Sequence, residues 1–523
     1  MSCPQTESTG VSIRELTIRG IVIGGMITII FTAANVYLGL KAGLTFATSI
    51  PAAVISMAIL RYFKDHSVQE NNIVQTIASA AGTLSAIIFV LPGLVMIGWW
   101  QGFPYWQSVA VIALGGVLGI MYSIPLRRAL VSHSDLPYPE GVAAAEVLRV
   151  GDSTEGEEES RRGLLAIIKG AVTSSGFAIL GSAKAVGTEI GTVFTVGAGG
   201  TMASASLSFA LLGVGHLVGI AVGIAMIVGL LISYGVLLPM RSWGLVGDPA
   251  SASELVSTIF RSEVRLIGAG AIAVAAVWTL LKLLAPIIGG IRDSLASSSK
   301  RASGEVLPLS EQDLSGKVVI GVTIGSMLLW LFPKDTPLVH HWIGLVLVSI
   351  LFILITGLAV ASVCGYMAGL IGASNSPISG VGILVAIAAA LVVKAVHGTI
   401  TGDELSVLVA YTLFTAALVF GIATISNDNL QDLKTGQLVG ATPWKQQLAL
   451  IIGVGFGAII IPPVLNLMHR AFGFQGAPGA GQNALAAPQA SLISDLIKGV
   501  FGGDLNWGLL GTGALIGMIV III

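Results

Sequence analysis

S-N-D-N-L-Q-D-L-K-T-G, residues Ser426–Gly436, is a dense polar block inside a very apolar chain. Of the 523 residues, 54% are hydrophobic and only 10% are charged, a composition that suits a lipid bilayer. A charged side chain at the centre of a membrane helix costs roughly 2.5–3.5 kcal/mol, so these Asp and Lys side chains cannot face lipid cheaply. Read as a helix, the block places four polar side chains on one face: Asp428, Gln431, Asp432 and Thr435.

A similar polar stripe occurs earlier, in Glu70–Thr83, E-N-N-I-V-Q-T-I-A-S-A-A-G-T. Aligned without a gap, Asn71 matches Asn427 and Gln75 matches Gln431. The shared phase predicts a repeated helix that faces a cavity, whereas the alternative for the later block is a solvated loop between two spans. The polar residues in phase on the earlier stripe are Asn72, Gln75, Thr76, Ser79 and Thr83.

Long apolar runs recur from Leu16 to Ile523, and about 20 apolar residues span a bilayer. We therefore expect an all-α, polytopic membrane protein with roughly a dozen or more crossings. The candidate spans are Leu16–Leu38, Leu44–Leu60, Ile73–Ile97, Val109–Leu126, Leu164–Ala183, Leu211–Leu238, Leu266–Ile288, Val318–Phe332, Ile343–Leu370, Ile378–Val393, Leu405–Ile425, Leu448–Pro463 and Leu509–Ile523. The small-residue tract Gly170–Ala210 predicts close helix packing with some broken helix.

Several classes of protein have no support in the sequence. A net charge of −1 gives no electrostatic basis for binding nucleic acid, and two distant cysteines give no basis for a disulfide framework. The chain has no G-x-x-x-x-G-K-[ST] phosphate loop and no H-E-x-x-H zinc motif. We predict no enzyme activity, no cofactor and no metal site.

The distribution of basic residues predicts an N-terminus on the cytoplasmic side. Arg14 and Arg19 precede the first span, and a basic loop at 127–162 follows the fourth. The uncharged aromatic stretch Trp99–Trp106 is typical of the outer membrane interface.

Two related halves are expected, 11–300 and 317–523, joined by the polar linker Ile291–Lys317. In the first half, Tyr37–Gly43 ends a helix and is followed by Pro51. In the second half, Tyr366–Gly372 is followed by Pro377 in the same way. Because the second half is shorter and ends in an apolar run, we expect further sequence after Ile523; the alternative is a short terminal helix that ends at the membrane surface.

Some candidate residues allow two interpretations. Glu140, in L-P-Y-P-E-G, caps a cytosolic helix or forms a cytoplasmic gate or cation entrance. The segment Asn375–Gly380 with Ser379 is a broken helix that holds an anionic group, or a simple Pro-initiated helix. Lys41 binds a substrate carboxylate or snorkels to the surface. Glu189 with Lys184 forms a buried ion pair or an exposed turn.

Four blocks of this sequence resemble the oligopeptide transporter family, over essentially the whole chain. They are N-V-Y-L-G-L-K-A-G-L (35–44), E-N-N-I-V-Q-T-I-A-S-A-A-G (70–82), L-P-Y-P-E-G-V-A-A-A-E-V-L (136–148) and S-N-D-N-L-Q-D-L-K-T-G-Q-L-V-G-A-T-P-W-K-Q-Q (426–447). The resemblance is closest to prokaryotic members and the yellow stripe-like branch. It implies a proton-coupled importer of peptides or metal chelates with about 16 helices, which brings the expected range to roughly 12–16.

We therefore expect a multi-pass protein of the cell membrane, the inner membrane if the source is bacterial. It would carry oligopeptides or related zwitterionic solutes by proton symport; the alternatives are a transporter of metal–chelate complexes and, from another class, a passive channel or membrane enzyme. A homodimer is left open. Proton coupling is assigned to Asp428, Asp432, Glu140 and Glu189. Substrate binding is assigned to Asn35, Tyr37, Lys41, Asn71, Asn72, Gln75, Ser79, Asn375, Ser379, Asn427 and Gln431.

Overall fold

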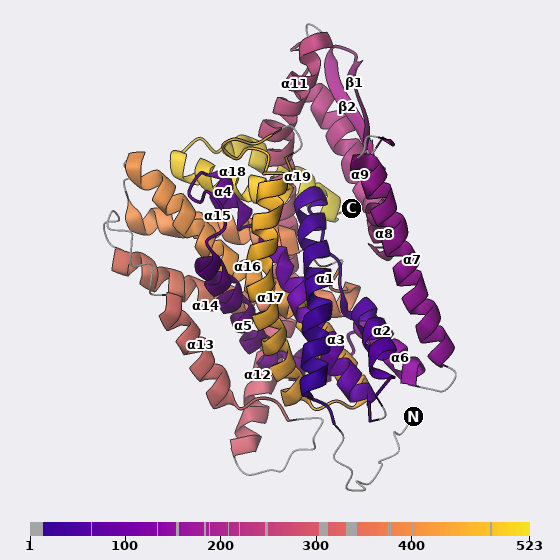
Figure 1. Ribbon diagram of the computed structural model, residues 1–523. Coiled ribbons are helices and arrows are strands. Elements are labelled where there is room, and N and C mark those ends of the chain that lie inside the picture. The colour runs from indigo at the N-terminus through magenta and orange to yellow at the C-terminus, as the bar shows by residue number, and fades with distance from the viewer. Residues whose placement is uncertain are drawn as a thin grey trace.

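The computed structural model describes residues 14–522, apart from 64, 133, 153–155, 183–184, 188, 208, 219, 246–248, 303–311, 331–341, 375, 377, 399–401 and 482–483. Helices make up most of this described part and form a tall bundle (Figure 1). The predicted all-α, polytopic fold is confirmed.

The first part of the chain forms helices joined by tight breaks. Its elements are α1 (Ile18–Ala42), α2 (Ser49–Leu60), α3 (Val68–Leu84), η1 (Ser85–Phe89), α4 (Pro92–Met96), α5 (Tyr105–Arg127) and η2 (Arg128–Ser132). Thr17 caps α1 because its side chain accepts a hydrogen bond from the Gly20 amide. Gly43 ends the same helix with a φ of 72°, a conformation that glycine adopts without strain.

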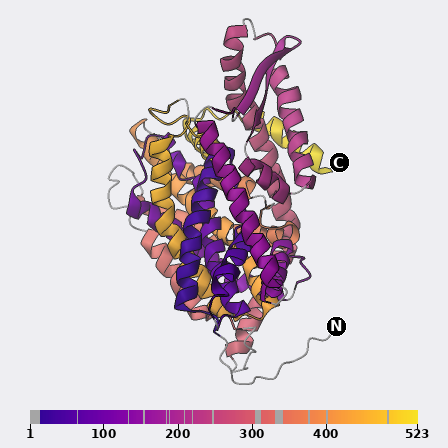
Figure 2. The same ribbon diagram turned by 45° about the vertical axis from the view of Figure 1, so that its right-hand side comes forward.

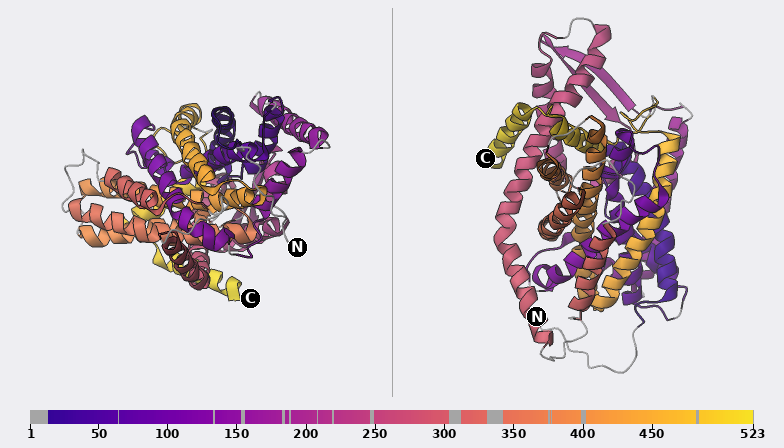
Figure 3. Two further views of the ribbon diagram at one scale, coloured as in Figure 1. Left: turned by 90° about the horizontal axis from the view of Figure 1, so that it is seen from below. Right: turned by 90° about the vertical axis from the view of Figure 1, so that its left-hand side faces the viewer.

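The middle of the chain runs up one side of the bundle, turns at a projecting hairpin and returns down another side as one long helix (Figures 1 and 3). Its elements are α6 (Pro139–Asp152), α7 (Gly156–Ser182), β1 (Glu189–Val196), β2 (Gly199–Ser206), α8 (Phe209–Val218), α9 (Ile220–Leu230), η3 (Leu231–Leu237), α10 (Leu238–Arg241), α11 (Pro249–Ile259), η4 (Phe260–Val264) and α12 (Arg265–Ala302). The strands and α11 project beyond the upper end of the bundle (Figures 1 and 2). The long helix α12 then descends the height of the molecule (Figure 3, right).

The last part of the chain supplies the centre of the bundle. Its elements are α13 (Gly316–Trp330), α14 (Trp342–Ile371), α15 (Ile378–His397), α16 (Gly402–Val439), α17 (Pro443–Ala471), α18 (Pro488–Gly502) and α19 (Trp507–Ile522). Helix α16 packs against α5, α14, α15 and α3, while α3 also packs against α17 and α1. Seen from below, these helices form a closely packed group (Figure 3, left). Gly115 and Gly421 allow α5 and α16 to cross with their backbones in contact.

The outer surface of the bundle is apolar and its interior holds polar side chains. Ile18, Ile30 and Ile220 are 82%, 64% and 83% exposed, as lipid-facing residues would be, whereas Asn72, Gln75 and Asp428 are fully buried. Eight helices of the described part are long and apolar enough to cross a membrane, and three shorter apolar helices accompany them. These helices supply part of the 12–16 crossings expected for the whole chain.

Two segments differ from the sequence-based expectation. The predicted span Leu44–Leu60 begins only at Ser49, because Gly43 ends α1 and residues 44–48 stay non-helical. The tract Gly170–Ala210 contains an antiparallel hairpin of β1 and β2, in register from Glu189–Ser206 to Val196–Gly199, and not helix throughout. Its β-branched and aromatic residues favour strand, and Gly197 supplies the left-handed turn with a φ of 62°.

The contact between α3 and α17 gives a test of this packing. A Cβ added at Gly453 would lie 2.5 Å from the Ile77 carbonyl oxygen, which belongs to the backbone and cannot rotate away. We expect Gly453→Ala to destabilise the protein by about 1–3 kcal/mol and to lower its melting temperature in detergent. Gly455→Ala on the same helix is the control, since no atom lies within 4 Å of its added Cβ. Equal melting temperatures for the two variants would contradict this packing.

Candidate functional site

The polar block Ser426–Gly436 lies inside α16 as uninterrupted helix, so the alternative of a solvated loop does not apply. Seven of its polar side chains are at most 1% exposed: Ser426, Asn427, Asp428, Asn429, Gln431, Asp432 and Thr435. Lys434 does not belong to this buried group. Its ammonium lies 6.0 Å from the centre of the Tyr138 ring and donates to the exposed Gln437 side chain. The buried face of α16 therefore carries two carboxyl groups without a cation from its own block.

The two polar stripes face each other across the α3–α16 contact. The Gln75 amide donates to Asp432 Oδ1. Ser79 and Thr83 both donate to Asp428 Oδ2, at 2.5 and 2.7 Å. Each carboxylate is thus held through one of its oxygens by side chains more than 300 residues away in the sequence.

The remaining oxygens of this cluster have no hydrogen-bond donor among the described residues. Six such oxygens are fully buried: Asp428 Oδ1, Asp432 Oδ2, Glu140 Oε2, Gln75 Oε1, Asn427 Oδ1 and Asn429 Oδ1. All of them are carboxyl or amide acceptors. An unpaired buried acceptor costs about 1–3 kcal/mol, and an unpaired charge costs more. The site is therefore short of donors and positive charge, and an ammonium group, a metal-bound amine or a proton would supply what is missing.

Two helix breaks enclose the cluster from opposite sides. After α1, Asn35 fixes residues 44–48 by accepting from the Phe46 amide and donating to the Phe46 and Gly82 carbonyls. After α14, Gly372 has a φ of 95°, and Asn427 donates to the Ala373 carbonyl at 3.0 Å. The positive φ of each glycine stops its helix, and an asparagine side chain then holds the freed backbone.

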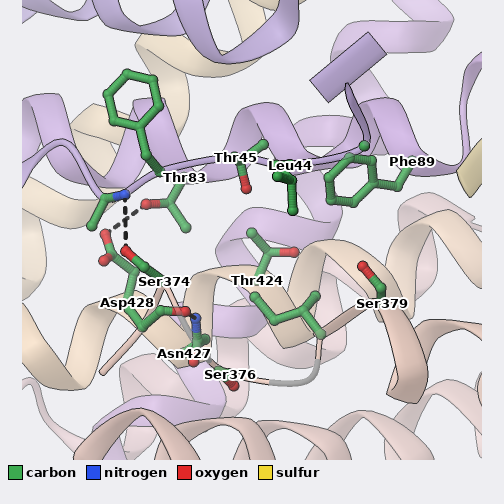
Figure 4. Close-up of a pocket in the computed structure, with 15 residues that line it drawn as sticks. Leu44, Thr45, Thr83, Phe89, Ser374, Ser376, Ser379, Thr424, Asn427 and Asp428 are labelled. Atoms are coloured by element: carbon green, nitrogen blue, oxygen red, sulfur yellow. Dashed lines mark hydrogen bonds between the residues drawn. The ribbon is translucent and has the colours of Figure 1, made fainter. Parts of the chain in front are cut away.

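A pocket of about 110 Å³ lies between these two breaks (Figure 4). Thr83 and Phe89 line it from one side, and Thr424, Asn427 and Asp428 line it from α16. The backbone breaks supply the other walls, which are Gly43, Leu44, Thr45, Phe46 and Ala47 after α1 and Ala373, Ser374, Ser376, Ile378 and Ser379 after α14. The two walls meet where the Ala47 amide donates to the Ser374 hydroxyl at 3.4 Å.

The first turn of α6, together with the loop before it, closes the lower side of the cluster. The Gly141 amide donates to Gln431 Oε1 at 2.7 Å, and Thr435 donates back to the Gly141 carbonyl at 2.9 Å. Glu140 Oε1 accepts from the Ser374 amide at 3.0 Å, so this carboxylate binds the α14 break. Burial raises the pKa of Tyr138, so its phenol keeps its proton and donates to the Leu130 carbonyl.

The predicted site residues thus separate into groups. Gln75, Ser79, Asn427, Gln431, Asp428, Asp432 and Glu140 form one connected cluster, and Ser379 lines the adjoining pocket. Asn72 is buried nearby with both amide atoms unpaired among the described residues, while Asn71 bonds Ser56 and Asn35 holds a backbone break. These last two side chains are committed to holding the fold.

Four other predicted residues lie elsewhere or beyond description. Lys41 is exposed at the end of α1, with its ammonium 3.4 Å from the Tyr37 hydroxyl, and neither residue lines the pocket. This arrangement fits the snorkelling interpretation. Asn375 lies outside the described residues. Glu189 begins β1 in the projecting hairpin, away from the α3–α16 cluster, and its side chain is not described.

Sequence reasoning missed several residues that the fold brings to this region. Gln446 of α17 donates to Thr76 and to the Asp432 carbonyl, at 3.1 and 2.6 Å. Ser374 supplies both an amide and a hydroxyl at the α14 break. Gln446 could have been found from the sequence, because it belongs to W-K-Q-Q, the end of the family-like block 426–447. No local sequence feature distinguishes Ser374. No group of three or more His, Cys, Asp or Glu side chains in the described part is placed to hold a metal ion.

Gln431 gives a direct test of how the loop is held. Its side chain accepts from the Gly141 amide and donates to the Ala368 carbonyl at 2.6 Å. Gln431→Ala leaves the Gly141 amide without this acceptor, whereas the Ala368 carbonyl keeps its bond from the Gly372 amide. We expect a destabilisation of about 1–3 kcal/mol from the unpaired Gly141 amide, seen as a lower melting temperature. Gln437→Ala, an exposed glutamine two turns later, is the control. A Gln431→Ala protein as stable as this control would contradict the role of the Gln431 side chain in holding the start of α6.

Comparison with known proteins identifies the family. The family model described as OPT oligopeptide transporter protein matches residues 15–523. A Haemophilus influenzae protein named "Putative oligopeptide transporter" is 44% identical over 512 residues, which cover 93% of this chain and 79% of that protein.

More distant similarity extends to plant transporters. An iron-phytosiderophore transporter of Oryza sativa is 25% identical, covering 88% of this chain and 72% of its own length. A metal-nicotianamine transporter of Arabidopsis thaliana is 22% identical, covering 93% and 76%. Together with the apolar helices, these matches show a multi-pass membrane protein. The chain belongs to the oligopeptide transporter family.

Proposed function

We propose that this transporter moves oligopeptides or related small zwitterionic solutes together with protons, and that the α3–α16 cluster is where solute and proton meet. The observation that carries this proposal is the set of buried acceptor oxygens without donors. A peptide ammonium offers three N–H donors and a positive charge, which are the two things that the cluster lacks. Asp428 is the favoured partner because it both lines the pocket and keeps Oδ1 unpaired.

The spacing of Asp428 and Asp432 supports a proton step. Four residues along a helix correspond to a rise of roughly 6 Å, so both carboxyl groups share one buried region. Two charges in a medium of low polarity repel, and burying either one without a partner is costly. The pair is therefore proposed to hold a proton when no solute ammonium is present, and the two groups titrate as a unit.

Glu140 connects this pair to the loop at the lower end. Its unpaired Oε2 is a third buried acceptor, and its Oε1 already binds the Ser374 amide. Glu140 is the next carboxylate on the way from the two aspartates to the predicted cytoplasmic side, so it is the proposed acceptor of a proton that leaves them. Because the same carboxylate holds the α14 break, a change in its charge would loosen the pocket wall.

The size of the pocket indicates that transport needs movement. Pockets that take drug-sized ligands usually measure about 300–1,000 Å³, and this one holds about 110 Å³. The start of α6 and the breaks after Gly43 and Gly372 are held in this closed arrangement by a few hydrogen bonds. Release of these contacts is the proposed opening step.

The order of elements favours two related halves. In each, a long helix (α1 or α14) ends at a positive-φ glycine, a non-helical break follows, and a further helix leads to one with a buried polar stripe (α3 or α16). The equivalent breaks form opposite walls of one pocket. The two proposed halves correspond to residues 11–300 and 317–523.

A second candidate substrate is a metal chelate built from amino-acid-like ligands. The plant relatives carry names of this kind, at 22–25% identity. The described part offers no cluster for a bare metal ion, so the chelator and not the metal would make the contacts. Such a chelator has amines and carboxylates, which the same cluster could bind.

Substitution of the two aspartates tests the coupling. We expect Asp428→Asn and Asp432→Asn each to reduce proton-driven accumulation of a dipeptide in proteoliposomes at least tenfold, because the amide carries no exchangeable charge. Solute exchange without a proton gradient should persist in at least one of the two variants. Glu146→Gln, an exposed acid on α6, is the control. Wild-type accumulation by both single variants and the double variant would place the proton carrier elsewhere.

Blocking the solute's ammonium tests what Asp428 binds. N-acetylation of a dipeptide removes its positive charge but keeps its carboxylate and peptide amide. We expect the acetylated peptide to compete for uptake at least tenfold more weakly than the free peptide, whereas a C-terminal amide should compete better than the acetylated form. Equal competition by free and acetylated peptides, with strong competition by an amine-bearing metal chelate alone, would favour the second candidate substrate.

A further inference from the structure

A second and larger cavity is lined by residues of α18, the helix at the upper end of the bundle in Figure 1. Its volume is about 740 Å³, which is within the usual range for pockets that take small-molecule ligands. Its walls come from η4, the first turns of α16, and α18 with the residues that follow it. Ile97 also lines it, beside the aromatic stretch predicted at the outer interface, so the cavity lies on the predicted outer side.

The cavity carries charges of both signs. Arg261 and Lys498 supply two cations, and Asp495 and Asp504 supply two carboxylates. All four side chains are exposed within the otherwise packed bundle. The lining is thus formally neutral while it presents separate positive and negative groups, which is the pattern that complements a zwitterion.

Several of these charges are free to meet a solute. Arg265 is committed to α18, since it donates to the Pro488 carbonyl at 2.6 Å, and its charge acts on Asp495. By contrast, no ion pair within 4.0 Å is formed by Lys498 or Asp504 with any described residue. Among the described residues, the Arg261 side chain hydrogen-bonds the Gln475 side chain, at 3.3 Å, and the charges of Arg261 and Lys498 also act on Asp495.

Apolar packing separates this cavity from the pocket beside Asp428. Both cavities touch α16, at Val409 and Thr424, which are 15 residues and therefore roughly 22 Å apart along the helix. Between them, Phe420 packs edge-on against Phe89 at 5.9 Å, and Phe414 packs against Trp100 at 5.4 Å. The upper cavity can therefore be occupied while the lower pocket is closed.

We propose that the upper cavity is an antechamber that captures the zwitterionic solute before transport, with Lys498 and Arg261 on its carboxylate and Asp504 on its ammonium. This proposal rests on the proposed function for the class of solute. The antechamber goes beyond the proposed function because it is a separate, first binding site for the solute. The antechamber raises the local solute concentration and sets the orientation in which the ammonium reaches the aromatic layer.

Kinetics give the first test. Lys498→Gln and Arg261→Gln should each raise the KM for dialanine about tenfold and leave the maximal rate within twofold of wild type. The reason is that each substitution weakens the first binding of the solute and leaves the coupling step intact. Lys317→Gln, an exposed lysine of α13 outside both cavities, is the control. A fall in maximal rate at unchanged KM would overturn the antechamber.

Chemical protection tests binding at the cavity itself. Ser406 lines the cavity and is exposed, so Ser406→Cys should react with a membrane-impermeant methanethiosulfonate, whereas the buried Cys364 should not. We expect dialanine to slow this reaction at least threefold. The protection should persist when Asp428→Asn and Asp432→Asn are added, and it should be lost when Lys498→Gln is added.

The combined variant separates the two proposals. If dialanine protects Ser406→Cys in the presence of both Asp→Asn substitutions, the antechamber binds solute on its own, whatever the coupling experiment shows. Lack of protection at dialanine concentrations that saturate wild-type transport would overturn it. Protection that disappears with the two Asp→Asn substitutions would also overturn it, since the effect would then report a conformational change at the lower pocket.

Discussion

The burial of two carboxyl groups on consecutive turns of α16 is the constraint on which the rest of the structure depends. Asp428 and Asp432 are fully buried in a bundle whose outer surface is apolar, and each receives donors from α3 through only one oxygen. Carboxylates held in this way fix α3 against α16. They also leave free acceptors that a proton or a donor-bearing cationic group would satisfy.

The surrounding elements follow from that constraint. Broken helices at membrane depth are tolerated where they line a polar cavity, and the two breaks meet beside Asp428. The start of α6, at Glu140 and Gly141, then bonds both α16 and the α14 break, so the helix that carries the two aspartates is tied to the lower side of the pocket. A change of charge at one point can thereby reach three backbone segments.

The sequence predicts much of the cluster but not its pairing. Polar phase in an apolar context identifies Gln75, Ser79 and Asp428, because the cost of exposing such groups to lipid is local and large. The pairing of Ser79 with Asp428 joins residues 349 apart, and no periodicity contains that information. The strands at Glu189–Ser206 were missed because their small residues also suit helix packing in lipid. Glu140 kept two interpretations, since its partner is a backbone amide that any sequence provides.

The most direct test of the central claim is a cryo-EM map of the protein in lipid nanodiscs with a saturating dipeptide. The account predicts solute density between the breaks at 43–47 and 373–379, with the solute's amino group in hydrogen-bonding contact with Asp428. It also predicts a pocket larger than the present 110 Å³. Solute bound elsewhere in the bundle, with Asp428 still buried and untouched, would contradict the account.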